Sequence, residues 1–217
     1  MLYIKIFELI FPNVCGFCGE KINERYTCRK CLNILEYYKE KVYFSSNFGE
    51  YLDGILCAFN YKGILKEKML QLKFHNNKYI SKTFGEILSY KITKYNLGAD
   101  VIVPVPICRK RYFERGYNQS EYIAKYVSKF CDIKLEKNIL KKVKNNKRQS
   151  LLDATERKLN VKDVYAIKEK ANVKGKNILL LDDIYTTGAT MDEMAQCLKS
   201  AGAEKIYCIS LAIGRGI

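Results

Sequence analysis

The stretch Ile178–Thr190, ILLLDDIYTTGAT, decides the fold of this 217-residue chain. Its apolar run is typical of a buried strand, and the run stops at Asp182 and Asp183. A short Thr/Gly segment leads into ATMDEMAQCLKSAG, residues 189–202, which predicts a helix closed by Gly202. A strand and a helix joined by so short a polar turn indicate an α/β sheet, where ligands bind at the carboxyl ends of the strands.

Strand and helix patterns alternate along the rest of the chain. Apolar runs predict strands at 54–61, 99–106, 176–183 and 204–213, and spaced apolar residues predict helices at 65–74, 79–95 and 118–130. Asn118 or Ser120 is available as a cap for the last of these helices. Cys57 and Cys208 fall in apolar strands, which predicts core positions. The alternation predicts a doubly wound, mostly parallel sheet.

The segment around the acidic pair has the chemistry of a ribose phosphate site. Asp182 and Asp183 can accept hydrogen bonds from a vicinal diol such as that of ribose. The N–H groups at a helix start can hold a phosphate, glycine lets the backbone approach it, and threonine hydroxyls add donors. The predicted 5-phosphate cradle is Thr186, Thr187, Gly188, Ala189 and Thr190. The plainer alternative is that the acidic pair only caps a loop.

A cysteine motif near the start predicts a metal site. In CGFCGEKINERYTCRKC, residues 15–31, two C-x-x-C pairs are separated by nine residues. Four thiolates at this spacing can close a tetrahedral shell around Zn²⁺, and such a closed site is usually structural. The predicted ligands are Cys15, Cys18, Cys28 and Cys31. An N-terminal helix and this knuckle form the predicted first domain, residues 1–42, followed by the α/β domain, residues 43–217.

Three pieces of the chain resemble known families. ILLLDDIYTTGAT looks like the motif with which type I phosphoribosyltransferases bind PRPP. DVIVPVPICRKRYFERGYNQSEYIA, residues 100–124, resembles the ComF family of bacterial competence proteins. Gln149, Arg157, Asn160 and Val161, together with the four-cysteine knuckle, also fit that family. The resemblance covers nearly the whole chain. It implies a phosphoribosyltransferase-like fold, ribose contacts from the acidic pair, and Mg²⁺ bound together with PRPP.

Basic residues near the second piece are the expected pyrophosphate contacts. The segment after Pro106 is expected to be a loop at the end of a neighbouring strand, and Gly116 is expected to mark a tight turn. Arginine forks bind phosphate oxygens in bidentate fashion. The predicted contacts are Arg109, Lys110, Arg111 and Arg115, with a solvated basic loop as the alternative. The basic run at 141–150 fits a lid over an anionic ligand, a contact for DNA phosphates or a solvated loop.

Three functions share this site. The first, implied by the ComF resemblance, is a competence-associated protein of DNA uptake that works with a DNA-translocating ATPase and single-stranded DNA. The second is an active phosphoribosyltransferase with an unidentified base or amine as acceptor, and the third is a PRPP or nucleotide sensor without turnover. No residue is predicted to be catalytic. His75, the only histidine, is expected at a helix end, and Cys108 lies within the basic segment.

Charge and hydropathy limit the possible partners and location of this protein. The net charge of +15 fits a polyanionic partner, or a lysine-rich solvated surface. No transmembrane segment is predicted, because the apolar residues 1–12 are too few and are interrupted by charges. We therefore expect a cytoplasmic protein, with a peripheral position at the inner face of the membrane as the alternative.

Overall fold

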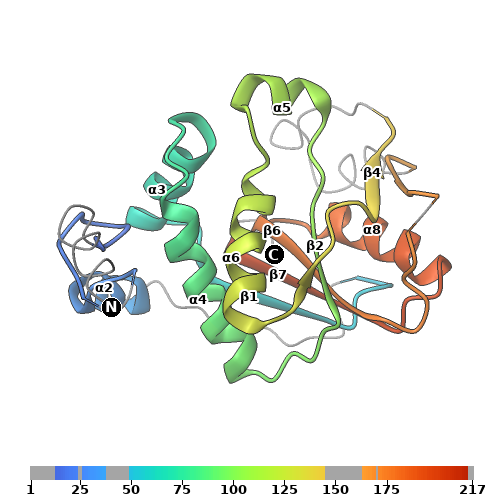
Figure 1. The fold of residues 1–217 in the computed structure, drawn as a ribbon, viewed down its shortest axis with the longest axis horizontal. Helices are drawn as coiled ribbons and strands as arrows, with labels where there is room; N and C mark the ends of the chain where they lie inside the picture. Colours follow the sequence, from blue (N-terminus) through green and yellow to red (C-terminus); the bar gives the residue numbers. More distant parts are fainter. Residues whose placement is uncertain (1–12, 24–25, 38–48, 145–162, 170, 215–217) are drawn as a thin grey trace, which may run out of the picture.

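The computed structural model describes residues 13–23, 26–37, 49–144, 163–169 and 171–214. Five strands form the main sheet in the order β1-β7-β6-β2-β3, and every pair in it is parallel (Figure 1). The strands are β1 (Gly54–Asn60), β2 (Val101–Pro104), β3 (Lys134–Leu135), β6 (Asn177–Tyr185) and β7 (Lys205–Ile213).

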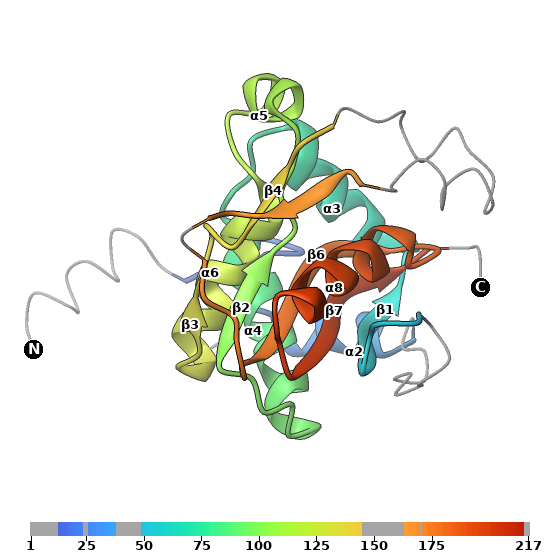
Figure 2. The ribbon, with the colours of Figure 1, turned by 90° about the vertical axis from the view of Figure 1, so that its right-hand side faces the viewer.

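Helices cover both faces of this sheet, as Figure 2 shows. Leu179 and Leu181 of β6 share a core with α3 (Gly63–Phe74), α4 (Ile80–Lys94) and α6 (Gln119–Cys131). Ile178 and Leu180 belong to a second core, which contains α8 (Ala189–Ser200). Burial on both faces explains why the strand sequence is continuously apolar instead of alternating. The predicted doubly wound parallel sheet is confirmed.

Strand β6 is longer than its apolar run indicates. The prediction ended the strand at Asp183, but Ile184 and Tyr185 continue the parallel register opposite Ala212 and Ile213 of β7. The acidic pair therefore lies within the last residues of a hydrogen-bonded strand. This position gives the two carboxylates a more rigid backbone than a loop would provide.

The segment after Pro106 is a helix, which corrects the predicted loop. Helix α5 (Arg109–Arg115) begins two residues after Ile107 and ends at Gly116, whose φ of 74° is the left-handed conformation common after helices. The sequence RKRYFER contains no glycine or proline, the residues that disfavour a helix most strongly. Its four predicted phosphate contacts are therefore arranged around a short helix.

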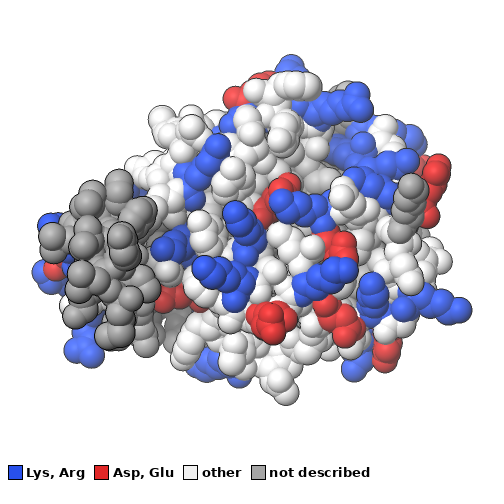
Figure 3. Space-filling model, in the orientation of Figure 1, with Lys and Arg blue, Asp and Glu red and all other residues white. Residues whose placement is uncertain are grey.

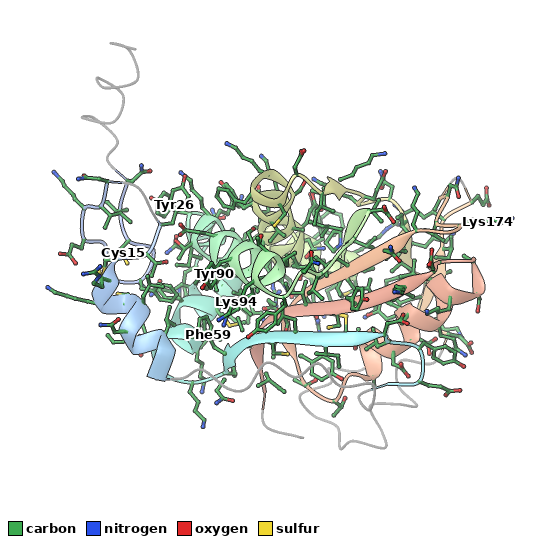
Figure 4. The ribbon with its side chains drawn as sticks, turned by 90° about the horizontal axis from the view of Figure 1, so that it is seen from below. Cys15, Tyr26, Phe59, Tyr90, Lys94 and Lys174 are labelled. Carbon is green, nitrogen blue, oxygen red and sulfur yellow. The ribbon has the colours of Figure 1, made fainter. Side chains whose placement is uncertain are left out.

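The cysteine knuckle, residues 13–37 without 24–25, packs on α4. Phe17 lies edge-on to Phe84 with ring centroids 6.1 Å apart. Thr83 Oγ1 donates to the Tyr26 carbonyl at 2.9 Å. The Gly16 backbone lies so close to side chains of α4 that a Cβ on Gly16 would be 2.2 Å from Thr83 Oγ1. Figure 4 shows Cys15 and Tyr26 at one end of the molecule and Lys174 at the other. The knuckle includes α2 (Arg29–Tyr37) and shares a core with the sheet's helices.

A two-stranded antiparallel sheet, β4 (Leu140–Lys142) and β5 (Tyr165–Ile167), completes the described fold. Lys141 and Lys142 of the basic run belong to β4, whereas 145–150 lies outside the described residues. The predicted N-terminal helix and the boundary between residues 42 and 43 lie outside them as well. None of the helices that the structure describes is long and apolar enough to cross a membrane.

Candidate functional site

The acidic pair lies at the carboxyl edge of the sheet, and its two members have different surroundings. Asp183 is 5% exposed, and its Oδ2 lies 2.5 Å from Lys73 Nζ at the end of α3. Asp182 is partly exposed, and its Oδ1 accepts hydrogen bonds from Ser120 Oγ at 2.8 Å and from the Asp183 N–H at 2.9 Å. The two carboxylates are thus held by α3 and α6, elements on the same face of the sheet.

Burial controls the charge of Asp182. It raises the pKa of the Asp182 carboxyl to about 7, and the neighbouring charge of Asp183 adds to the shift. The Ser120 hydroxyl and the more distant Lys73 oppose it by stabilising the ionised form. Near neutral pH, Asp182 is therefore close to its titration midpoint. A ligand that donates hydrogen bonds to the carboxylate would draw it into the ionised form.

The threonine-glycine segment forms a turn that opens α8. Gly188 has a φ of 76°, a conformation that other residues rarely adopt, and its carbonyl accepts the first helical bond from Asp192 N–H at 2.8 Å. The hydroxyl of Thr187 is buried and has no hydrogen-bond partner among the described residues. A buried donor beside the N-terminus of a 12-residue helix fits an anion such as phosphate.

The four cations of α5 are not equivalent. Arg109 and Lys110 are exposed, whereas Arg111 and Arg115 are partly buried. Arg115 Nη1 donates to Gln119 Oε1 at 2.8 Å. Burial lowers the pKa of the Arg115 guanidinium, and the charge of Asp183 opposes this shift. Arg115 is thus a cation of α5 that interacts electrostatically with the acidic pair.

The buried polar residues that follow α5 form a scaffold. Asn118 caps α6 by accepting from Ser120 N–H at 3.0 Å, as predicted, and its Nδ2 donates to the Val105 carbonyl at 2.9 Å. Gln119 holds Arg115, and Ser120 holds Asp182. The segment RGYNQS, residues 115–120, therefore links α5, the end of β2 and the acidic pair through hydrogen bonds.

A known protein family matches the part of the chain that contains this site. The family model described as the phosphoribosyl transferase domain matches residues 71–216, more than half of the chain. The chain belongs to this phosphoribosyltransferase domain family. The matched span includes the acidic pair, the threonine-glycine turn and α5, and it leaves the cysteine knuckle outside.

Named relatives cover most of the chain. This chain is 28% identical over 205 residues to "Competence protein F" of Haemophilus influenzae, and the match covers 92% of this chain and 90% of that protein. It is 29% identical to "Competence protein ComFC" of Bacillus subtilis, covering 89% and 74%. It is 27% identical to "DNA utilization protein YhgH" of Escherichia coli, covering 71% and 70%. The phosphoribosyltransferase domain is therefore related to proteins named for competence and DNA use.

The cysteine knuckle precedes the region that matches the phosphoribosyltransferase domain, and it brings its four cysteines together. The sulfur atoms of Cys15, Cys18, Cys28 and Cys31 all lie within 4.8 Å of one another. Tetrahedral zinc with Zn–S bonds of about 2.3 Å requires sulfurs about 3.8 Å apart, so the cluster fits. Three of the four are buried, and the Cys28 N–H donates to Cys15 Sγ at 3.3 Å.

Other sequence predictions lie outside the site or at its edge. Cys57 and Cys208 are buried in the core, as predicted. His75 follows α3 as its C-cap, with its N–H bonded to the Gln71 carbonyl. Cys108 is partly exposed at the start of α5. Two contacts of the acidic pair were not predicted, Lys73 with Asp183 and Ser120 with Asp182.

Proposed function

We propose that this protein binds PRPP or a related ribose phosphate at the carboxyl edge of β6. The observation that carries the proposal is the acidic pair followed within four residues by the buried hydroxyl of Thr187, just before α8, which has no hydrogen-bond partner among the described residues. A diol acceptor next to an anion cradle matches the two ends of a ribose 5-phosphate. Membership of the phosphoribosyltransferase domain family supports the same ligand.

Each part of the site has a distinct role in this proposal. Asp182 and Asp183 accept hydrogen bonds from the ribose hydroxyls, and residues 186–190 hold the 5-phosphate. The pyrophosphate faces α5, with Arg111 and Arg115 as its nearest cations because they are the partly buried ones. Mg²⁺ bound together with the ligand would supply further neutralisation of charge.

Replacing Asp183 by asparagine is expected to weaken PRPP binding about tenfold or more, because a charge-assisted hydrogen bond to a ribose hydroxyl is lost. The measurement is isothermal titration of PRPP with Mg²⁺. Asp132→Asn is the matched control, since Asp132 is exposed at the far end of α6 with a φ of 54° that asparagine accepts well. Equal affinity of wild type and Asp183→Asn, or no binding to wild type, would remove the site assignment.

A transferase and a sensor share this binding step. Transfer requires an acceptor aligned at the anomeric carbon and stabilisation of the departing pyrophosphate, for which α5 provides the cations. Pyrophosphate release across a panel of nucleobases and amines distinguishes the two. Release that depends on one acceptor identifies an enzyme, and saturable PRPP binding without release identifies a sensor.

We also propose that the cysteine knuckle holds a structural Zn²⁺. The donor set of four thiolates leaves no position open for a substrate, and the knuckle packs into the core through Phe17. A metal is the usual means by which so small a segment becomes stable. The role of the ion is therefore to support the fold.

A role in DNA uptake is the second functional proposal, supported by the names of the relatives. Lys and Arg side chains gather over α5 and β4, in the upper right of Figure 3. In this role, single-stranded DNA phosphates contact that basic surface, and the protein acts with a DNA-translocating ATPase at the cytoplasmic side of the membrane. Exposed Tyr112 and Phe113 on α5 offer rings on which bases can stack.

Binding to a labelled single-stranded oligonucleotide is expected to weaken steeply between about 50 and 200 mM salt, because counterions are released from DNA. Arg109→Gln/Lys110→Gln is expected to reduce both the affinity and the slope of its salt dependence. Lys125→Gln/Lys129→Gln, which removes two exposed charges from α6, is the matched control. Fluorescence anisotropy measures both. Equal effects of the two double variants would argue against the α5 surface as the contact.

A further inference from the structure

The last turn of α3 contacts three parts of the site through three consecutive residues. The Leu72 carbonyl accepts a hydrogen bond from the Tyr117 hydroxyl. Lys73 Nζ lies 2.5 Å from Asp183 Oδ2. The ring of Phe74 lies 5.2 Å from the Arg115 guanidinium carbon. This turn therefore belongs to the site, although no sequence motif pointed to it.

The ion pair of Lys73 and Asp183 is well shielded from water. The two side chains are 16% and 7% exposed. Tyr61, just after β1, lies beside the pair: burial raises the pKa of its hydroxyl, while Lys73 lowers and Asp183 raises it. Attraction between the two charges is stronger here than at a surface, since fewer water molecules screen it.

Asp183 Oδ2 is a buried oxygen with an unused acceptor position among the described residues. No donor among the described residues makes a regular hydrogen bond to Asp183 Oδ2, because the ammonium of Lys73 approaches it outside hydrogen-bond geometry. A carboxylate oxygen has two lone pairs, so it can face a cation and still accept a hydroxyl. Lys73 thus neutralises Asp183 without completing its hydrogen bonding.

The charges of the ligand make such a neutraliser useful. A ribose 5-phosphate brings about two negative charges close to the two carboxylates, and a pyrophosphate adds more. In the proposed arrangement, the cations of α5 lie beside the pyrophosphate and not beside the ribose. Among the described residues, the cation paired directly with the acidic pair is Lys73.

We propose that Lys73 is a positioning residue that acts as a fixed cation for Asp183, so that the ribose 5-phosphate half of the ligand binds without a divalent ion. Mg²⁺ is then needed only for the pyrophosphate half. This inference rests on the proposed ribose phosphate site. It assigns to the protein part of the charge neutralisation that a metal would otherwise supply.

The test uses ribose 5-phosphate, which lacks pyrophosphate, in isothermal titrations with EDTA and with Mg²⁺. Wild type is expected to bind equally well in both. Lys73→Met is expected to bind about tenfold more weakly in EDTA and to recover at least part of that loss with Mg²⁺, while Lys73→Arg retains most of the affinity. Lys66→Met, an exposed lysine on the same helix, is the control and is expected to behave as wild type.

Several outcomes would overturn the inference. Equal binding by Lys73→Met and wild type in EDTA would do so, as would a wild type that itself requires Mg²⁺. Tighter binding by Lys73→Met would show that Lys73 blocks the site. If neither wild type nor Lys66→Met binds ribose 5-phosphate or PRPP with Mg²⁺, the proposed function fails as well. Thermal unfolding of each variant shows whether a weak binder is folded.

Discussion

Serine in place of Cys31 is expected to abolish zinc binding and to unfold the cysteine knuckle. Wild type is expected to contain one zinc per chain, because the four sulfurs already lie within 4.8 Å of one another. Binding of a structural zinc contributes on the order of 10 kcal/mol to the folding of such modules. Serine oxygen is a poor replacement for a thiolate, and Cys31 is buried, with 3% of its surface exposed.

The damage is expected to spread to α4. The knuckle covers Phe84 with Phe17, and Thr83 and Glu86 hold the Tyr26 backbone through hydrogen bonds of 2.9 Å each. Loss of the knuckle would expose this face of α4 and break those two hydrogen bonds. Hydrogen exchange should therefore accelerate in Ile80–Lys94, together with a fall in the melting temperature.

Metal analysis and thermal unfolding measure the two effects. Cys131→Ser is the matched control, because Cys131 is partly exposed at the end of α6 and lies outside the cluster. Its zinc content is expected to equal that of wild type. A wild-type protein that is folded and free of metal after purification in zinc-containing medium would refute the assignment.

Local patterns predicted β1, β2, β6 and β7 well because these strands are largely apolar. The run before Asp182 is typical of a strand buried on both faces, and the short threonine-glycine turn placed α8 directly after it. The same local signals failed at α5. Four cations and two prolines just upstream indicate a solvated loop, whereas the helix depends on Gly116 to end it.

The site residues were predicted only where they are neighbours in sequence. The acidic pair and the cradle form one continuous stretch, so their chemistry could be interpreted together. Ser120 and Lys73 reach the pair across 62 and 110 residues, and single residues of common types give no local signal. Such contacts follow from the packing of α3 and α6 against the sheet. The structure was needed to identify them.

Asparagine in place of Asp182 is expected to stabilise the protein, and to do so more at pH 8 than at pH 4. Burial raises the pKa of this carboxyl from 3.8 to about 7 in the folded chain. The folded state therefore binds the proton more tightly than the unfolded state. The contribution of Asp182 to the stability of wild type is fully present below about pH 4 and is lost as the pH rises through 7. The largest pH-dependent change that this shift allows in the free energy of unfolding is about 4 kcal/mol.

Urea unfolding of wild type and Asp182→Asn between pH 4 and 8 measures this difference. The asparagine Oδ1 can still accept from Ser120 Oγ and from the Asp183 N–H, so the substitution removes charge and little else. Asp132→Asn, which replaces an exposed carboxylate at the other end of α6, is the matched control. A destabilisation by Asp182→Asn that is equal at every pH would contradict the expected pKa.

The same substitution is expected to weaken PRPP binding. A neutral amide at position 182 cannot accept a charge-assisted hydrogen bond from the ribose, although it removes the cost of a buried charge. Stability and ligand affinity should therefore change in opposite directions above pH 7. This combination is expected of a carboxylate kept for binding and is not expected of one that only caps a turn. It separates the two interpretations of Asp182 without requiring knowledge of an acceptor.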